Sequence, residues 1–306
     1  MFARILVPTD FSASSDAALG YARMFAWTSG GALHLLHVCG DRLTPPHAEG
    51  HRDREPAALR RIRDRLTEAD QRHRLKIRVV ERAAPAEAIL DYARTADIDL
   101  IVMGTHGRSG VTHLLMGSVS EKVVRSAPCP VLTTHGAPPP AASFTRILVP
   151  TDFSEPSDAA LDCARLLQLR FGASIRLLHV LEDQLLEGPF GSEAFVAAPP
   201  ETRAARLREA RERLSHRVPA ADYESGRTTS EILFGPTANT ISHYAADNGF
   251  DLIVMSTHGR TGLAHLLMGS VAERVVRSAS CPVITTRGER PCLVAVGARA
   301  ESAAAS

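Results

Sequence analysis

The chain has 306 residues, of which 44% are apolar and 23% charged, a composition typical of globular domains that bury a core. Its 35 basic and 34 acidic residues leave a net charge of +1, so we expect no attraction to nucleic acid or to an anionic membrane. The five cysteines include no C-x-x-C pair, and no apolar run approaches the roughly 18–20 residues that span a bilayer. We therefore expect a cytoplasmic chain of two domains, kept in a reducing compartment.

Strand-like and helix-like patterns alternate from residue 1 to residue 135. Apolar runs at 4–8, 31–38, 77–81, 99–103 and 131–134 predict five strands, and helical patterns lie at 13–28, 55–72, 86–96 and 118–127. The strand-like runs are nearly continuously apolar, as expected when helices cover both faces of a parallel sheet. This alternation predicts a doubly wound α/β domain.

The whole pattern occurs twice. Residues 4–12 recur letter for letter as 146–154, and residues 105–127 recur as 257–279 with five differences. The numbering offset between the copies is larger in the second pair than in the first, which predicts an insertion in the second copy, within residues 181–230. We predict a first domain over 1–135, a proline-rich linker over 136–145, a second domain over 146–287 and a C-terminal tail over 288–306.

Candidate functional residues follow the strands, because open parallel sheets bind ligands at the carboxyl ends of their strands, where the strand order reverses. Pro8, Thr9 and Asp10 follow the first strand, and a loop from Gly104 to Gly107 follows the fourth. Gly117 and Ser118 then open a helix, whose first N–H groups attract anions. One interpretation is therefore a phosphate site in which Asp10 accepts hydrogen bonds from ribose hydroxyls.

A ligand-free interpretation accounts for the same residues. Residues 118–121 and 270–273 each have the pattern of a capping box, and Asp10 before Ser12 is typical of a turn that caps a helix. His106 and its counterpart His258 fit a loop-orienting role better than an acid–base role, since no partner carboxylate is evident. The histidine spacing does not support a metal site.

Three common motifs are absent from the sequence. There is no G-x-x-x-x-G-K-[ST], no G-x-G-x-x-G after the first strand and no G-x-S-x-G. Their absence excludes a P-loop NTPase and argues against a dinucleotide-binding Rossmann domain and an α/β-hydrolase.

The glycine pattern Gly104-x2-Gly107-x9-Gly117-Ser118, with the opening Ile-Leu-Val-Pro-Thr-Asp-Phe-Ser, resembles the signature of the universal stress protein family. The resemblance covers nearly the whole chain, twice over. It implies five-stranded domains with strand order 3-2-1-4-5, each binding ATP, with or without magnesium. It also implies antiparallel pairing of the last strands, at 131–134 and 283–286, which would join the two domains into a pair that dimerises further.

The resemblance also implies individual binding residues. Near the adenosine, ribose and phosphates of the first copy it places Pro8, Thr9, Asp10, Val38, Met103, Gly104, His106, Gly107, Gly117, Ser118 and Val119. In the second copy the corresponding residues are Pro150, Thr151, Asp152, Val180, Met255, Gly259, Gly269, Ser270 and Val271. Ser256 replaces the glycine found at 104, and it would weaken the second site if that glycine has a positive φ or touches the ligand.

The leading hypothesis is a cytoplasmic stress-response protein that binds ATP as a regulatory ligand, more tightly at the first site. We do not expect rapid turnover, because neither a phosphate-binding lysine nor clustered carboxylates for magnesium are evident. Two alternatives remain open. One is a nucleotide-free interaction module that dimerises, and the other is a slow nucleotide hydrolase that uses His106.

Overall fold

The computed structural model describes residues 2–39, 57–71, 74–81, 84–105, 116–136, 139, 143–182, 184–187, 193–196, 199–218, 220–224, 226–259 and 268–287. The chain divides into two compact units between Ala142 and Ser143. The tail predicted over 288–306 lies outside the described residues. Within the described part, no helix has the length and hydropathy to cross a membrane.

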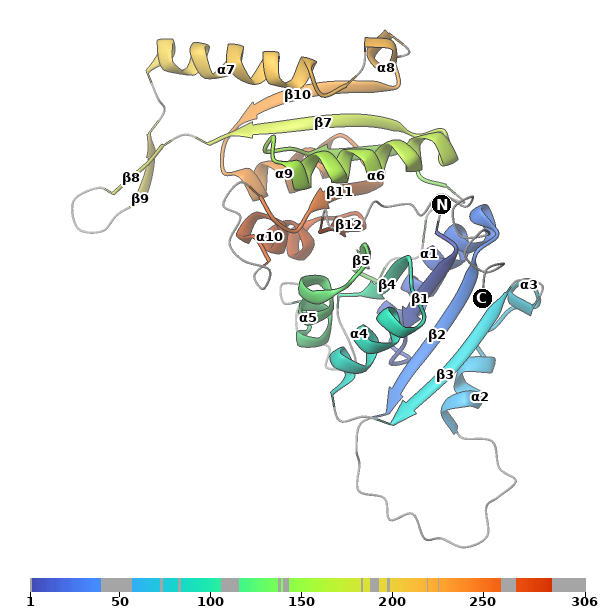
Figure 1. Ribbon diagram of the computed structural model, residues 1–306. Helices are drawn as coiled ribbons and strands as arrows, with labels where there is room; N and C mark the ends of the chain where they lie inside the picture. The colour runs from blue at the N-terminus through green and yellow to red at the C-terminus, as the bar shows by residue number, and fades with distance from the viewer. Residues whose placement is uncertain are drawn as a thin grey trace, which may run out of the picture. The chain divides into compact units, whose positions relative to one another are not determined.

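The first unit is a parallel sheet with helices between its strands. In chain order its elements are β1 (Arg4–Pro8), α1 (Ala13–Ser29), β2 (Ala32–Cys39), α2 (Ala57–Arg63), α3 (Glu68–Gln71), β3 (Leu75–Glu81), α4 (Pro85–Thr95), β4 (Leu100–Gly104), α5 (Ser118–Ser126) and β5 (Val131–Thr134). The strand order β3-β2-β1-β4-β5, parallel throughout, confirms the predicted order 3-2-1-4-5 (Figure 1). Right-handed crossovers place α1 and α2 on one face of this sheet and α4 and α5 on the other.

The second unit repeats this arrangement. Its elements are β6 (Arg146–Pro150), α6 (Glu155–Phe171), β7 (Ser174–Leu181), β8 (Gln184–Glu187), β9 (Glu193–Val196), α7 (Pro200–Ser215), α8 (Ala220–Glu224), β10 (Thr228–Phe234), α9 (Thr237–Asp247), β11 (Leu252–Ser256), α10 (Ser270–Ser278) and β12 (Val283–Thr286). The parallel order is β10-β7-β6-β11-β12. The antiparallel pair of β8 and β9 falls within the range predicted for the insertion.

The central strands form the core of each unit. Residues 5–7 of β1 and 147–149 of β6 have no solvent exposure, which explains their uninterrupted apolar sequence. Cys129 and Cys281 are buried and carry free thiols. Cys163 of α6, in contrast, is disulfide-bonded, so the reduced thiols expected from the cysteine count do not extend to that residue.

The single helix predicted over 55–72 is wrong, because the chain leaves the helix after Arg63 and starts α3 at Glu68. Thr67 and Asp70 cause the break. The backbone N–H and the hydroxyl of Thr67 donate to Asp70 Oδ2 over 2.7 and 2.9 Å, and Asp70 N–H donates back to the Thr67 hydroxyl. These reciprocal bonds make Thr67 the cap of a new helix.

The two units differ on the face of the sheet that α4 and α9 cover. In the first unit His34 of β2 is 1% exposed, and its Nδ1 lies 2.9 Å from the Tyr92 hydroxyl. In the second unit the corresponding strand residue is Arg176, which donates to the Tyr244 hydroxyl and pairs with Glu231. Burial, with help from the charges of Lys76 and Arg4, lowers the pKa of His34 from 6.5 to about 4.

The first unit should therefore lose stability as the pH falls from about 6.5 towards 4, because the unfolded chain binds a proton at His34 that the folded chain excludes. Between pH 7 and pH 5 we expect a loss of about 2 kcal/mol from this residue. Urea unfolding followed by the fluorescence of Trp27, the one tryptophan of the chain, reports on this unit. The His34→Gln variant should lack this part of the pH dependence, and an equal dependence in both proteins would contradict the assignment.

Candidate functional site

The first unit has a cavity of about 270 Å³ at the carboxyl ends of β1, β2 and β4. It is lined by most of the residues predicted for the first copy, namely Pro8, Thr9, Asp10, Val38, Met103, Gly104, Gly117, Ser118 and Val119. His106 and Gly107 lie outside the described residues. The structure also adds Ser15, Leu36, Pro85, Ile89 and Ser120 to the wall.

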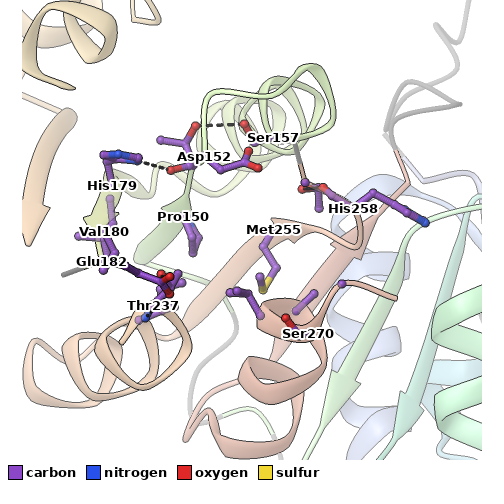
Figure 2. Close-up of a pocket in the computed structure, with 18 of the residues that line it drawn as sticks. Pro150, Asp152, Ser157, His179, Val180, Glu182, Thr237, Met255, His258 and Ser270 are labelled. Carbon is purple, nitrogen blue, oxygen red and sulfur yellow. Dashed lines mark hydrogen bonds between the residues drawn. The ribbon is translucent and has the colours of Figure 1, made fainter. Parts of the chain in front are cut away.

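The second unit has the corresponding cavity, of about 480 Å³, shown in Figure 2. Every residue predicted for the second copy lines it, namely Pro150, Thr151, Asp152, Val180, Met255, Gly259, Gly269, Ser270 and Val271. Ser256 and His258 also lie in its wall. Among the residues that it describes, the structure thus brings the predicted residues of each copy together around one cavity.

The aspartate after the first strand of each unit forms a tight turn. Asp10 Oδ1 accepts hydrogen bonds from the backbone N–H of Ser12 over 3.0 Å and from its hydroxyl over 2.6 Å. Asp152 and Ser154 repeat these bonds at 3.1 and 2.6 Å. Ser12 and Ser154 in turn cap α1 and α6, as predicted for Ser12. The turn and the cavity coexist, because both aspartates also line the cavities.

The Asp152 carboxylate lies against the loop after β11. A Cβ added to Gly259 would lie 2.6 Å from Asp152 Oδ2, so this carboxylate fits against the loop because residue 259 has no side chain. One carboxylate oxygen therefore holds the turn, while the other lies beside the glycine loop.

The helices α5 and α10 begin at the cavities with glycine caps. Gly117 and Gly269 are the N-cap residues, and neither cap has a side-chain hydrogen bond. The predicted capping boxes are wrong, because Ser118 and Ser270 are the first helical residues rather than the caps. The N-terminal N–H groups of both helices thus lack a side-chain acceptor at the caps, which favours an anionic ligand at this end of each cavity.

These cap glycines are needed for close packing. An added Cβ would lie 3.3 Å from the Thr105 carbonyl at Gly117, and 3.1 Å from the Thr257 carbonyl at Gly269. Each glycine N–H donates to that same carbonyl over 2.8 Å. Larger residues would therefore push the helix start away from the strand that precedes it.

Gly104 and Ser256, which occupy matching positions, do not differ in the sign of φ, the first of the two reasons predicted for a weaker second site. Neither residue has a positive φ. Gly104 is tightly enclosed by α1 instead, since a Cβ there would lie 2.0 Å from the hydroxyl oxygen of Ser14. Ser256 donates its own hydroxyl to the His258 carbonyl over 2.7 Å. The backbone at residue 256 is therefore not in the left-handed conformation that would weaken the second site through strain.

Two aromatic residues that the sequence patterns did not indicate support the aspartate turns. Phe11 and Phe153 both have φ of +67°, a left-handed conformation that costs a residue with a side chain about 1–2 kcal/mol. Next to them, His37 and His179 donate from Nδ1 to the carbonyls of Thr9 and Thr151, over 2.7 and 2.8 Å. The exact repetition of Phe and His in both copies was the signal in the sequence.

The second cavity also has charged residues that the sequence did not indicate. Figure 2 shows Glu182 and Thr237 together, at the end of the cavity away from His258. Thr237 donates to Glu182 Oε1 from its hydroxyl over 2.5 Å and from its N–H over 3.2 Å. Arg206 of α7 donates to the Glu182 carbonyl over 2.9 Å and lines the same cavity.

His258 interacts with the loop that carries it. Its Nδ1 lies 2.9 Å from the hydroxyl of the neighbouring Thr257, and that hydroxyl also donates to the Thr286 carbonyl. This contact fits the loop-orienting role that the sequence favoured for His258. Within the described ranges, no group of three or more His, Cys, Asp or Glu side chains is arranged to hold a metal ion.

Fold and cavities together define a tandem α/β protein with a cavity at the switch point of each unit's sheet. The sequence profile of the universal stress protein family matches residues 1–135 and again 143–287. The chain belongs to the universal stress protein family.

Similar proteins extend this result to the whole chain. A universal stress protein of Mycolicibacterium smegmatis is 28% identical, over 92% of this chain and 96% of its own. Universal stress protein MJ0531 of Methanocaldococcus jannaschii is 33% identical, over 47% of this chain and 82% of its own. The crystal structure of a universal stress protein from Archaeoglobus fulgidus has the same fold, with a TM-score of 0.61 and 21% identity over 93% of this chain and 98% of its own.

The packing of Gly104 gives a direct prediction. Gly104→Ser should destabilise the first unit by about 1–3 kcal/mol, because the new Cβ would also lie 2.9 Å from the backbone carbon of Ser14, which helix α1 holds in place. Urea unfolding followed by Trp27 fluorescence measures this loss. Ser256→Gly is the matched control and should leave the Trp27 transition unchanged. An unchanged transition in Gly104→Ser would contradict the close packing.

Proposed function

We propose that the chain is a cytoplasmic stress-response protein that binds ATP as a regulatory ligand, at one site in each unit. The observation that carries this proposal is the same in both units. Two features line one cavity: the start of a helix that has no side-chain cap, and an aspartate turn. A helix N-terminus favours phosphate, and a carboxylate accepts hydrogen bonds from ribose hydroxyls.

The remaining wall fits the base of a nucleotide. Val180 and Met255 in the second cavity, like Val38 and Met103 in the first, offer apolar surface next to these polar groups. The second cavity, of about 480 Å³, lies within the range of roughly 300–1,000 Å³ typical of small-molecule sites, and the first, of about 270 Å³, lies just below that range. We propose that phosphates bind at α5 and α10, ribose at Asp10 and Asp152, and adenine against the valine and methionine.

Equilibrium dialysis with ATP tests this proposal by counting sites. We expect two ATP per chain for the natural sequence, and one for Gly117→Val or Gly269→Val, since either substitution crowds the start of one helix. The double variant should bind none while circular dichroism shows it folded. A natural chain that binds no ATP at millimolar concentration would contradict the proposal and favour the nucleotide-free interaction module.

The hydrolase alternative has its own test. We propose that turnover is slow or absent, because the chain lacks the lysine of the P-loop. If phosphate release is nevertheless measured, His106→Ala should abolish it without loss of ATP binding. Turnover that survives this substitution would exclude a role for His106.

We also propose that the first site binds ATP more tightly, now for a different reason. The Ser256 hydroxyl ties the loop after β11 to the His258 carbonyl, and Gly104 has no side chain to form such a bond. If ATP must rearrange this loop, breaking one hydrogen bond costs about 1 kcal/mol, or about fivefold in affinity. Calorimetry on the two single-site chains measures both dissociation constants, and equal values would contradict the difference.

For assembly, we propose that the last strands of the two units, β5 and β12, pair antiparallel within the chain and that the pair dimerises further. Each is the last strand in the order of its unit, and a terminal strand can accept another strand. Small-angle scattering should give the profile of one compact particle. A profile of two separated bodies on a linker would contradict the pairing.

A further inference from the structure

We infer that two arginines in each unit are positioning residues for the aspartate turn of the binding site. They are Arg61 and Arg65 in the first unit and Arg213 and Arg217 in the second. The inference rests on the proposed ribose contact of Asp10 and Asp152. It concerns how the turn that carries each aspartate is held.

The turn needs holding because its backbone is strained. Phe11 and Phe153, directly after the aspartates, have φ of +67°, a conformation that usually requires glycine. Local hydrogen bonds account for part of its stability, since the Phe11 N–H donates to the Thr9 hydroxyl over 3.1 Å, and Phe153 to that of Thr151 over 3.0 Å. Both copies use phenylalanine here, so the aromatic ring provides something that glycine cannot.

In each unit that ring contacts an imidazole and both guanidiniums, with Arg61 or Arg213 the nearer of the two. Phe153 lies 4.2 Å from the His179 ring, centroid to centroid, and the Arg213 guanidinium lies 4.3 Å from the phenylalanine centroid. In the first unit the matching distances, from Phe11 to His37 and Arg61, are both 4.4 Å. A cation at this distance from an aromatic ring is favourable.

The second arginine connects the turn to the following helix. Arg217 Nε donates to Asp158 of α6 over 2.6 Å, and its Nη2 donates to the Phe153 carbonyl over 2.8 Å. Arg65 makes the same two bonds, to Asp16 over 2.6 Å and to the Phe11 carbonyl over 3.3 Å. A planar guanidinium can form both bonds at once, whereas the ammonium of lysine lacks this fixed fork geometry.

In each unit a further arginine holds the backbone of Arg65 or Arg217. Arg165 of α6 donates to the Arg217 carbonyl over 2.8 Å, and Arg23 of α1 donates to the Arg65 carbonyl over 2.6 Å. In the first unit Asp70 fixes Arg23 through two bonds of 2.9 and 2.7 Å. The strained turn is thus connected to the helices on its face of the sheet through a continuous set of charged hydrogen bonds.

The contribution of the ribose hydroxyls to ATP affinity tests whether these arginines position the aspartate. In a chain that keeps only the second site, through Gly117→Val, calorimetry compares ATP with 2′,3′-dideoxy-ATP, which lacks both hydroxyls. The parent should prefer ATP. Arg217→Met should lower ATP affinity about tenfold and leave the dideoxy affinity unchanged, because the aspartate loses its orientation. Arg208→Met, at an exposed arginine of the preceding helix α7, is the matched control and should change neither affinity.

The other outcomes each count for or against the inference. A folded Arg217→Met chain that keeps the parent's preference for ATP would overturn the inference, as would full rescue by Arg217→Lys. If Arg217→Met does not fold, Arg213→Met is the second variant. It removes only the contact of Arg213 with the Phe153 ring and leaves Arg217 in place. It should lower the preference about threefold, and an unchanged preference would overturn the inference. A parent that binds no ATP would refute the proposed function itself, and one that binds both nucleotides equally would refute the ribose contact on which the inference rests.

Discussion

Both cavities depend on the parallel pairing of the first strand of each unit with the fourth. In the first unit this ladder joins Ile5 to Leu100 and Leu6 to Ile101 and goes no further, and in the second it joins residues 147–148 to 252–253. The chain after β1 crosses to α1 on one face, and the chain after β4 leads to α5 on the other. The aspartate turn and the helix N-terminus therefore meet at one edge of the sheet, with space between them.

The two units build this edge in the same way. The bonds from aspartate to the capping serine are 3.0 and 2.6 Å long in one copy and 3.1 and 2.6 Å in the other. The copies differ where the first helix of each unit meets the strand β4 or β11. In the first unit Gly104 lies against Ser14 of α1. In the second unit the residues at the matching positions are Ser256 and Pro156. The strained turn is thus a shared feature, and this helix packing is one of the places where the copies have diverged.

Much of this arrangement could be predicted from the sequence. Apolar runs and the internal repeat predicted the doubly wound sheets, and the residues after β1, β4, β6 and β11 predicted where the cavities lie, because the carboxyl ends of parallel strands meet at one edge. Arg61 and Arg213 contact equivalent phenylalanine rings, and so do His37 and His179, so the members of each pair occupy matching positions. The numbering offset increases between these two pairs. The extra residues of the second copy therefore lie between His179 and Arg213. The offset between the two copies alone leaves that range open to residue 230.

Other features depend on geometry that a sequence pattern does not contain. The sequence of residues 118–121 has the capping-box pattern, but the pattern does not show whether Ser118 is the cap or the first helical residue. In the structure Gly117, whose N–H donates to the Thr105 carbonyl, is the cap. Gly104 is required by the approach of α1, a contact between distant parts of the sequence. The arginines that hold Phe11 come from α2 and the turn that follows it, and arginine on a helix is normally a solvated surface residue.

The most direct test of the account is a crystal structure of the full chain with ATP. We expect the triphosphate at the first N–H groups of α5 and α10, and the ribose hydroxyls within hydrogen-bond distance of Asp10 and Asp152. Nucleotide bound with its phosphates away from both helix N-termini, or bound outside the two cavities, would contradict the account.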